Sequence, residues 1–277
     1  MILVQVIAGG LLIGAVYALF SAGLTLVWGM MNVINFAHGE FVMLGMYVAF
    51  WAYTLLHAGP AGFSALAAVL LFMLGVFVYL LLIRHVMRGP MLAQILSTFG
   101  LLLFLRYAAY WAFSANFVTL PEGLFGPSLN AGGILLSAPK LVGGAVALLL
   151  TRTAVGSQIL AVAEDRQAAM LMGIRPDRMQ ALAWGLAGAS AGIAGALIAT
   201  FFPISPTVGE SLALIAFVVV TLGGFGSVPG AMLAGVIVGL IESLSAFYFG
   251  PVYQDVFVYG LFVLILWVRP HGLLGKA

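Results

Sequence analysis

The sequence predicts an all-α, polytopic bundle of about eight or nine membrane-spanning helices, with one further short helix on the cytoplasmic side. Hydrophobic residues make up 64% of the 277 residues and charged residues only 6%, whereas a soluble domain has about 25% charged residues. The mean hydropathy is +1.21. The long apolar runs do not alternate with polar residues, which excludes a porin-type barrel. We expect residues 1–277 to form a single transmembrane domain.

The apolar runs divide into nine candidate spans, because a helix needs about 20 apolar residues to cross the hydrocarbon core. Glycine and proline clusters, such as those at 57–60 and 226–229, separate the runs. The weakest run is 134–150, which Lys140 interrupts and which is either a full span or a short, tilted one. The nine runs are 2–28, 41–57, 63–83, 91–113, 134–150, 180–202, 211–224, 230–249 and 256–268.

The few basic residues give an orientation, because lysine and arginine are enriched in cytoplasmic loops. Arg84 and Arg88 mark one cytoplasmic loop, and Arg269 marks a cytoplasmic C-terminal end. The loop at 114–129 carries only one charge and is expected outside. The side of the N-terminus stays open: three full spans before Arg84 place it outside, and a re-entrant segment at 29–57 places it inside.

The segment at about 151–180 carries the densest charge in the chain. Six of the 18 charged residues lie between Glu164 and Arg178. Ser157 can cap the start of a helix and Gly173 can end it, and small apolar residues between them recur at helical spacing. The pattern predicts an amphipathic cytoplasmic helix of about four turns. This helix is either a docking element for a soluble partner or an ordinary charged loop.

Several stretches resemble one family of membrane proteins. The spacing of alanine, aspartate, glycine and isoleucine in 161–174 is similar to the coupling loop of ABC importer permeases. Residues 14–47, 181–197 and 212–244 resemble the branched-chain amino acid ABC transporter permeases of the LivH type. The resemblance implies that six residues contact an ATPase subunit: Ala161, Glu164, Asp165, Ala169, Gly173 and Ile174.

The resemblance also implies a function and a set of partners. The chain would be an integral membrane permease subunit of an ABC importer, moving branched-chain amino acids, or related small polar solutes such as urea or amides, inward. It has no nucleotide-binding motif, so we expect no enzyme activity and no cofactor, with ATP bound by separate ATPase subunits. The other implied partners are a substrate-binding protein, periplasmic or extracellular, and a second permease in a heterodimer, with a homodimer as the alternative. The implied location is the bacterial cytoplasmic (inner) membrane, and no basic stripe indicates nucleic acid.

Two other functions are compatible with some of these residues. A gradient-driven secondary transporter or channel would use carboxylates such as Glu40, Glu242 or Asp255. An intramembrane enzyme would use His38 and Glu40, but no set of nucleophile, base and orienting group can be assembled around them.

A polar set follows the first apolar run, comprising Asn32, Asn35, His38 and Glu40. A charged carboxylate at the bilayer centre costs about 3 kcal/mol or more, so these residues must face the bundle interior or water. They either line the translocation path at a broken helix or link helices through hydrogen bonds. A metal site is not expected, because His38 has one nearby carboxylate and no second histidine.

Arg106 and Glu242 are isolated charges within apolar runs. Arg106 either reaches an interface with its charged end or pairs with Glu242, which is also a candidate for the translocation path. Two glycine-rich stretches complete the pattern. Small residues from 185 to 196 predict close helix packing, and residues 222–230 predict a tight turn between two spans.

Overall fold

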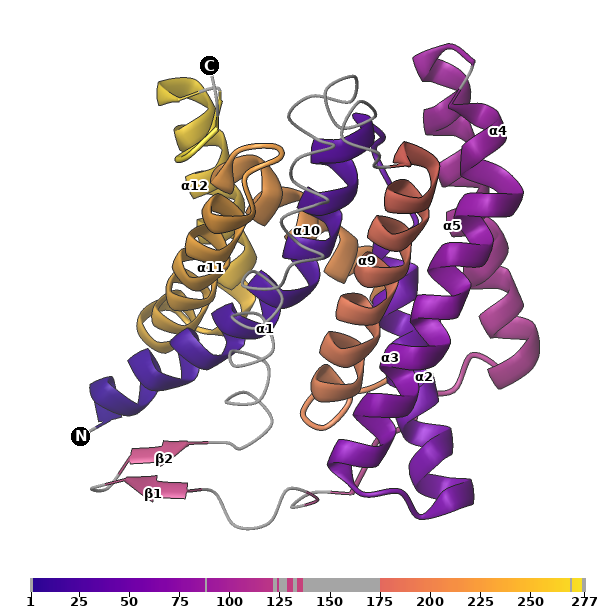
Figure 1. Cartoon of the computed structure of the whole chain (residues 1–277). Coiled ribbons are helices and arrows are strands. Elements are labelled where there is room, and N and C mark those ends of the chain that lie inside the picture. Colours follow the sequence, from indigo (N-terminus) through magenta and orange to yellow (C-terminus); the bar gives the residue numbers. More distant parts are fainter. Residues whose placement is uncertain are drawn as a thin grey trace.

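The computed structural model describes residues 2–87, 89–121, 124, 129–131, 134–136, 175–269 and 271–275. Within these residues the chain forms a helix bundle with one short pair of strands (Figure 1). The helices are α1 (Ile2–Met31), α2 (His38–Leu56), α3 (Pro60–Val78), the π-helix η1 (Tyr79–Ile83), α4 (Arg84–Val86), α5 (Met91–Phe113), α9 (Pro176–Ile198), α10 (Val208–Gly223), α11 (Val228–Phe249), the 3-10 helix η2 (Pro251–Tyr253) and α12 (Gln254–Val268). The strands are β1 (Leu129–Ala131) and β2 (Ile134–Leu136).

Seven helical stretches of the described residues are long and apolar enough to cross a membrane. α3, η1 and α4 join into one of them, Pro60–Val86, and η2 and α12 join into another, Pro251–Val268. α10 is apolar but has only 16 residues, about 24 Å of helix, which is less than the hydrocarbon core of about 30 Å. Eight of the nine predicted runs thus coincide with helices, and the predicted membrane helix bundle is confirmed.

The remaining run, 134–150, does not begin as a helix as expected. Ile134–Leu136 forms β2, which pairs antiparallel with β1 so that Ala131 lies opposite Ile134. Two glycines separate the strands in the sequence, a spacing typical of a tight β-hairpin. Residues 137–150 lie outside the described residues, so a span there stays a prediction.

α1 and α9 form the centre of the bundle. α1 packs against α11 and α9, and α9 also packs against α2 and α3, so these two helices join the α11–α12 side to the α2–α5 side (Figure 1). The small residues predicted to allow close packing do so. A Cβ on Gly45 of α2 would lie 2.7 Å from the carbonyl oxygen of Gly192 of α9. A side chain there would force the two helices apart.

The two ends of the bundle carry different segments. The α4 turn, the start of α9 and the C-terminal end lie at one end, and the N-terminus and the β1–β2 pair lie at the other (Figure 1). The first of these ends holds Arg84, Arg175 and Arg269, the residues expected on the cytoplasmic side. Three helical stretches precede the turn after Arg84, so the N-terminus is at the end opposite the C-terminus.

The predicted turn between α10 and α11 is confirmed. Gly224 and Gly226 have φ of 98° and 81°, the left-handed region that glycine adopts without strain. Ser227 caps α11, because its hydroxyl oxygen accepts a hydrogen bond from the Gly230 N–H at 3.2 Å. The C-terminal segment packs onto this turn through a hydrogen bond from the Leu273 N–H to the Leu222 carbonyl oxygen at 2.8 Å.

Candidate functional site

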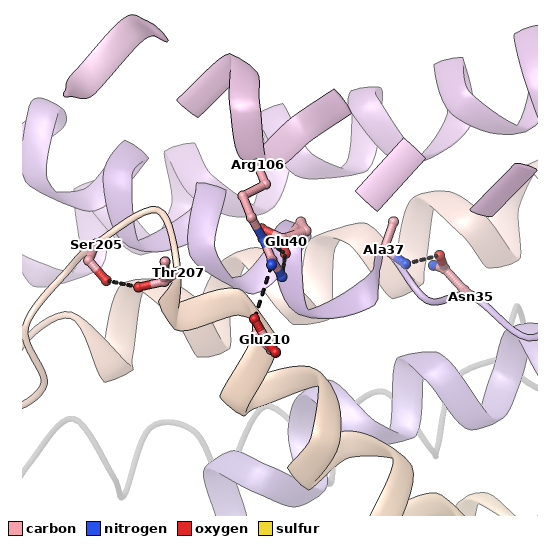
Figure 2. Close-up of polar contacts among 7 residues, drawn as sticks. All are labelled: Asn35, Ala37, Glu40, Arg106, Ser205, Thr207 and Glu210. Carbon is pink, nitrogen blue, oxygen red and sulfur yellow. Dashed lines mark hydrogen bonds and ion pairs between the residues drawn. The ribbon is translucent and has the colours of Figure 1, made fainter. Parts of the chain in front are cut away.

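The polar set after α1 lies at a break between two helices. α1 ends at Met31, and Asn32 has φ of 53°, which no helix residue adopts. Asn35 is buried, and its side-chain oxygen accepts a hydrogen bond from the Ala37 N–H at 3.1 Å (Figure 2). Thr98 of α5 donates a hydrogen bond to the Ile34 carbonyl oxygen at 2.8 Å. The chain is therefore broken between α1 and α2 at these polar residues, and α5 holds the break in place.

His38 and Glu40 both lie in the first turn of α2, but they have different surroundings. His38 is buried, and its Nε2 lies 2.7 Å from the Phe20 carbonyl oxygen of α1. That oxygen can only accept, so Nε2 carries the proton. This contact joins α2 to α1, as expected of a polar link between helices.

Glu40 belongs to a charged cluster formed by three helices. Arg106 of α5 donates to Glu40 Oε1 from Nη2 at 2.7 Å and from Nε at 3.1 Å. Its Nη1 donates to Glu210 Oε2 of α10 at 3.0 Å. Figure 2 shows the guanidinium between the two carboxylates. Of the two alternatives for Arg106, the pairing with Glu242 is wrong, because the break at 32–37 brings the start of α2 beside α5 and α10 instead.

The three members of this cluster differ greatly in exposure. The side chains of Glu40, Arg106 and Glu210 have exposed fractions of 1%, 16% and 64%. Glu40 Oε2 is buried and has no hydrogen-bond partner among the described residues. Glu40 and Arg106 thus form a buried pair, and Glu210 contacts Arg106 from the exposed side.

Two close approaches fix the geometry of this cluster. A Cβ on Gly39 of α2 would collide with the carbonyl oxygen of Gly209, and a Cβ on Gly209 would lie 2.6 Å from Glu40 Oε2. Near the same point, Ser205 and Thr207 are hydrogen-bonded to each other at 3.1 Å before α10 begins (Figure 2). Small residues at these positions let α10 approach α2 closely enough for both carboxylates to reach one guanidinium.

Glu242 lies in another part of the bundle, on α11. It is half-buried and has a side-chain hydrogen bond with Tyr17 of α1. The neighbouring Ser243 donates to the Val6 carbonyl oxygen at 2.9 Å. These contacts lie between α1 and α11, so Glu242 is not part of the cluster that contains Glu40.

A second polar cluster joins η1 and α4 to the start of α9. Arg84 and Asp177 form an ion pair at 3.1 Å, with exposed side-chain fractions of 49% and 54%. Tyr79 is buried and its hydroxyl donates to Gln180 Oε1 at 2.8 Å, while Asp177 Oδ1 lies 3.3 Å from the same hydroxyl oxygen. We call these four residues the α9 joint. It lies where the chain leaves the charged segment at 151–175 and enters the membrane bundle.

The residues expected to contact an ATPase lie outside the described residues, so their arrangement stays a prediction: Ala161, Glu164, Asp165, Ala169, Gly173 and Ile174. The described ranges contain no group of three metal-ligating side chains. Sequence reasoning did not identify Glu210 as a site residue. The available signal was its position as a lone charge at the start of an apolar run, beside Gly209.

Comparison with known proteins assigns the chain to a family. The sequence model of the family described as "Branched-chain amino acid transport system / permease component" matches residues 6–266. The permease protein BraD of a high-affinity branched-chain amino acid transport system of Pseudomonas aeruginosa is 33% identical, over 98% of this chain and 95% of that protein. The LivH permease protein of the corresponding system of Escherichia coli is 31% identical over the same shares.

One solved structure shares the fold. A chain of PsaBC from Streptococcus pneumoniae, solved in complex with Fab, superposes with a TM-score of 0.51. The match covers 95% of this chain and 91% of that chain, at 12% sequence identity. At this identity the likeness concerns the arrangement of helices alone.

Proposed function

The chain belongs to the family of branched-chain amino acid transport permeases, and from this premise we propose that it forms the membrane-spanning subunit of an ABC importer that moves leucine, isoleucine and valine into the cell. The single observation that carries the proposal is the similarity to two such permeases over 98% of the chain. A helix bundle with seven stretches fit to cross a membrane agrees with it.

Energy enters this transporter from separate subunits that hydrolyse ATP. We place their contact on the charged segment at 161–174, through Asp165 and Gly173 among others. The α9 joint supports this placement, because Arg84 and Tyr79 hold the first turn of α9 directly after that segment. A movement of the segment is thereby passed to α9, which packs against α1, α2 and α3.

The remaining partners follow from the same family. A binding protein delivers the amino acid on the outer side, and a second, related permease completes the pathway in a heterodimer. The membrane is the bacterial cytoplasmic (inner) membrane. Residues 1–277 form one transmembrane domain, and catalysis belongs to the ATPase subunits.

Reconstitution tests the proposal. The chain is placed in proteoliposomes with its partner permease, the ATPase subunits and the binding protein, and uptake of radiolabelled leucine is measured with and without ATP. Asp165→Lys reverses a charge on the proposed contact helix. Gly173→Pro replaces the glycine at which that helix is expected to end. We expect severe loss of ATP-driven uptake and of ATPase copurification in both variants, with normal insertion into the membrane.

Arg269→Gln is the matched control, because it removes an exposed charge at the same end of the bundle, outside the proposed contact. Uptake in this variant should equal that of the wild type. Leucine uptake that an ion gradient drives without the ATPase subunits would contradict the proposal and favour a secondary transporter. If the ATPase copurifies with Asp165→Lys and Gly173→Pro as well as with the wild type, the placement of the contact is contradicted.

A further inference from the structure

The cluster of Glu40, Arg106 and Glu210 lies within the membrane part of the bundle. Arg106 is seven residues before the end of α5 at Phe113, about 10 Å inside that end at 1.5 Å per residue. The segments after α5 and before α10 are joined at the outer side by a bridge between Val118 and Ile204. The cluster therefore lies below the outer surface, where a charge is costly unless it meets water or an opposite charge.

The charges of this cluster do not balance. Two carboxylates and one guanidinium leave one net negative charge. In the buried Glu40–Arg106 pair, one negative and one positive charge cancel. The remaining negative charge therefore belongs to Glu210, on the exposed side of the cluster. Facing lipid, an exposed carboxylate at this depth would be strongly unfavourable. A water-filled path beside the face of α10 that carries Glu210 would remove this cost, and the carboxylate would there be suited to receive a cationic group.

The same cluster also offers hydrogen-bond donors to an anionic group. A guanidinium has five N–H donors, and three contacts to the two carboxylates are present here. Two N–H groups therefore remain, one on Nη1 and one on Nη2, and guanidinium N–H groups are strong donors to carboxylates. One site thus presents a carboxylate for an ammonium group and guanidinium donors for a carboxylate group.

The next turn of α10 is apolar. Leu214 lies four residues after Glu210, on the same side of the helix, and its exposed fraction is 50%. Neighbours at this spacing lie about 5–6 Å apart, which matches the distance from the charged groups of an aliphatic amino acid to its side chain. The exposed face of α10 thus offers a charged end and an apolar end at this distance.

We propose that Glu210, Arg106 and Leu214 form a binding site for a zwitterionic aliphatic amino acid within the transport path. Glu210 takes the α-ammonium group, the free N–H groups of Arg106 take the α-carboxylate, and Leu214 contacts the side chain. Glu40 is the positioning residue that holds the guanidinium. This site rests on the proposed function and assigns its substrate contact to named residues.

Cysteine protection tests the site, since the chain contains no cysteine. Leu214→Cys is introduced and the transporter is assembled in nanodiscs with its partner subunits. Alkylation of this cysteine by N-ethylmaleimide is followed by mass spectrometry, without nucleotide and with a non-hydrolysable ATP analogue. We expect leucine to slow alkylation in at least one state. At the same concentration, 4-methylpentanoate, which lacks the amino group, and 3-methylbutylamine, which lacks the carboxyl group, should not.

Glu210→Gln in this background should weaken the protection by leucine about tenfold or more, since a charged hydrogen bond is lost. Glu210→Asp should restore part of it. Arg269→Gln is the control and should leave protection unchanged. Because Glu210 is exposed, its substitution should not alter the yield or monodispersity of the complex.

Two results would overturn the site. One is equal protection by leucine in Leu214→Cys with Glu210 intact and in Leu214→Cys combined with Glu210→Gln. The other is a cysteine at position 214 that is unreactive in both nucleotide states. If the wild-type transporter takes up leucine with ATP and the Leu214→Cys transporter shows either result, the site is refuted and the proposed function stands. A wild-type transporter without ATP-driven uptake would instead refute the proposed function.

Discussion

Arg106 of α5 donates to carboxylates of two other helices, Glu40 on α2 and Glu210 on α10. Its two contacts differ in their effect on stability. The pair with Glu40 is almost fully buried, where loss of one partner leaves a charge without compensation. The contact with Glu210 is exposed and contributes little to folding. One guanidinium thus combines a structural contact with the contact to substrate proposed above.

Replacement of Arg106 separates these roles. Arg106→Gln should lower the free energy of unfolding by about 3–5 kcal/mol, because the Glu40 carboxylate stays buried without its partner. Unfolding of the purified chain in mixed detergent micelles measures the change. The double variant Glu40→Gln, Arg106→Gln should recover most of the loss, since neither group is then charged. If the Arg106→Gln variant is as stable as the wild type, a structural role for the Glu40–Arg106 pair is contradicted.

Prediction of this cluster from the sequence was partial. Glu40 stands out because it lies among asparagine, histidine and glycine residues in an apolar chain. Arg106 and Glu210 are also visible as isolated charges, but their sequence separations of 66 and 104 residues fix no contact. Only the packing of α2, α5 and α10 decides that Arg106 meets Glu40 and not Glu242.

The helices themselves were largely predictable, because each needs only an apolar run and a break. Eight expected runs coincide with helices, and the break at 32–37 falls among the polar residues that indicated it. The π-helix η1 was not predictable. It carries Tyr79, which reaches Gln180 on α9, a contact that depends on packing. The strands β1 and β2 were also missed, since three residues each are too few for a periodicity signal.

The α9 joint combines a buried and an exposed contact, which a matched pair of variants distinguishes. Tyr79→Phe should lower the free energy of unfolding by about 1–3 kcal/mol, because the buried Gln180 oxygen loses its donor. Arg84→Gln should change it by less than about 1 kcal/mol, since the ion pair with Asp177 is half exposed. Unfolding in mixed micelles measures both. A larger effect of Arg84→Gln than of Tyr79→Phe would contradict this account of the joint.

Across the molecule, the arginines of the described ranges other than Arg106 lie in α4, at the start of α9 and after α12. These segments are at one end of the bundle, and the N-terminus lies at the other (Figure 1). Charge asymmetry alone predicts that the end with these arginines is cytoplasmic. The same end holds the α9 joint, directly after the segment at 161–174. The proposed importer requires this segment to be in the cytoplasm, where ATP is hydrolysed, and the charged cluster of Arg106 to be open to the transport path.

The side of the membrane that residue 165 occupies tests this requirement most directly. Asp165→Cys and, as an outer reference, Gly59→Cys are each introduced into the cysteine-free chain, and intact cells are treated with a membrane-impermeant maleimide. Gly59 is exposed between α2 and α3, at the end expected outside. We predict that the cysteine at position 59 is labelled in intact cells and the cysteine at position 165 only after the membrane is opened. Labelling at position 165 in intact cells would contradict the account.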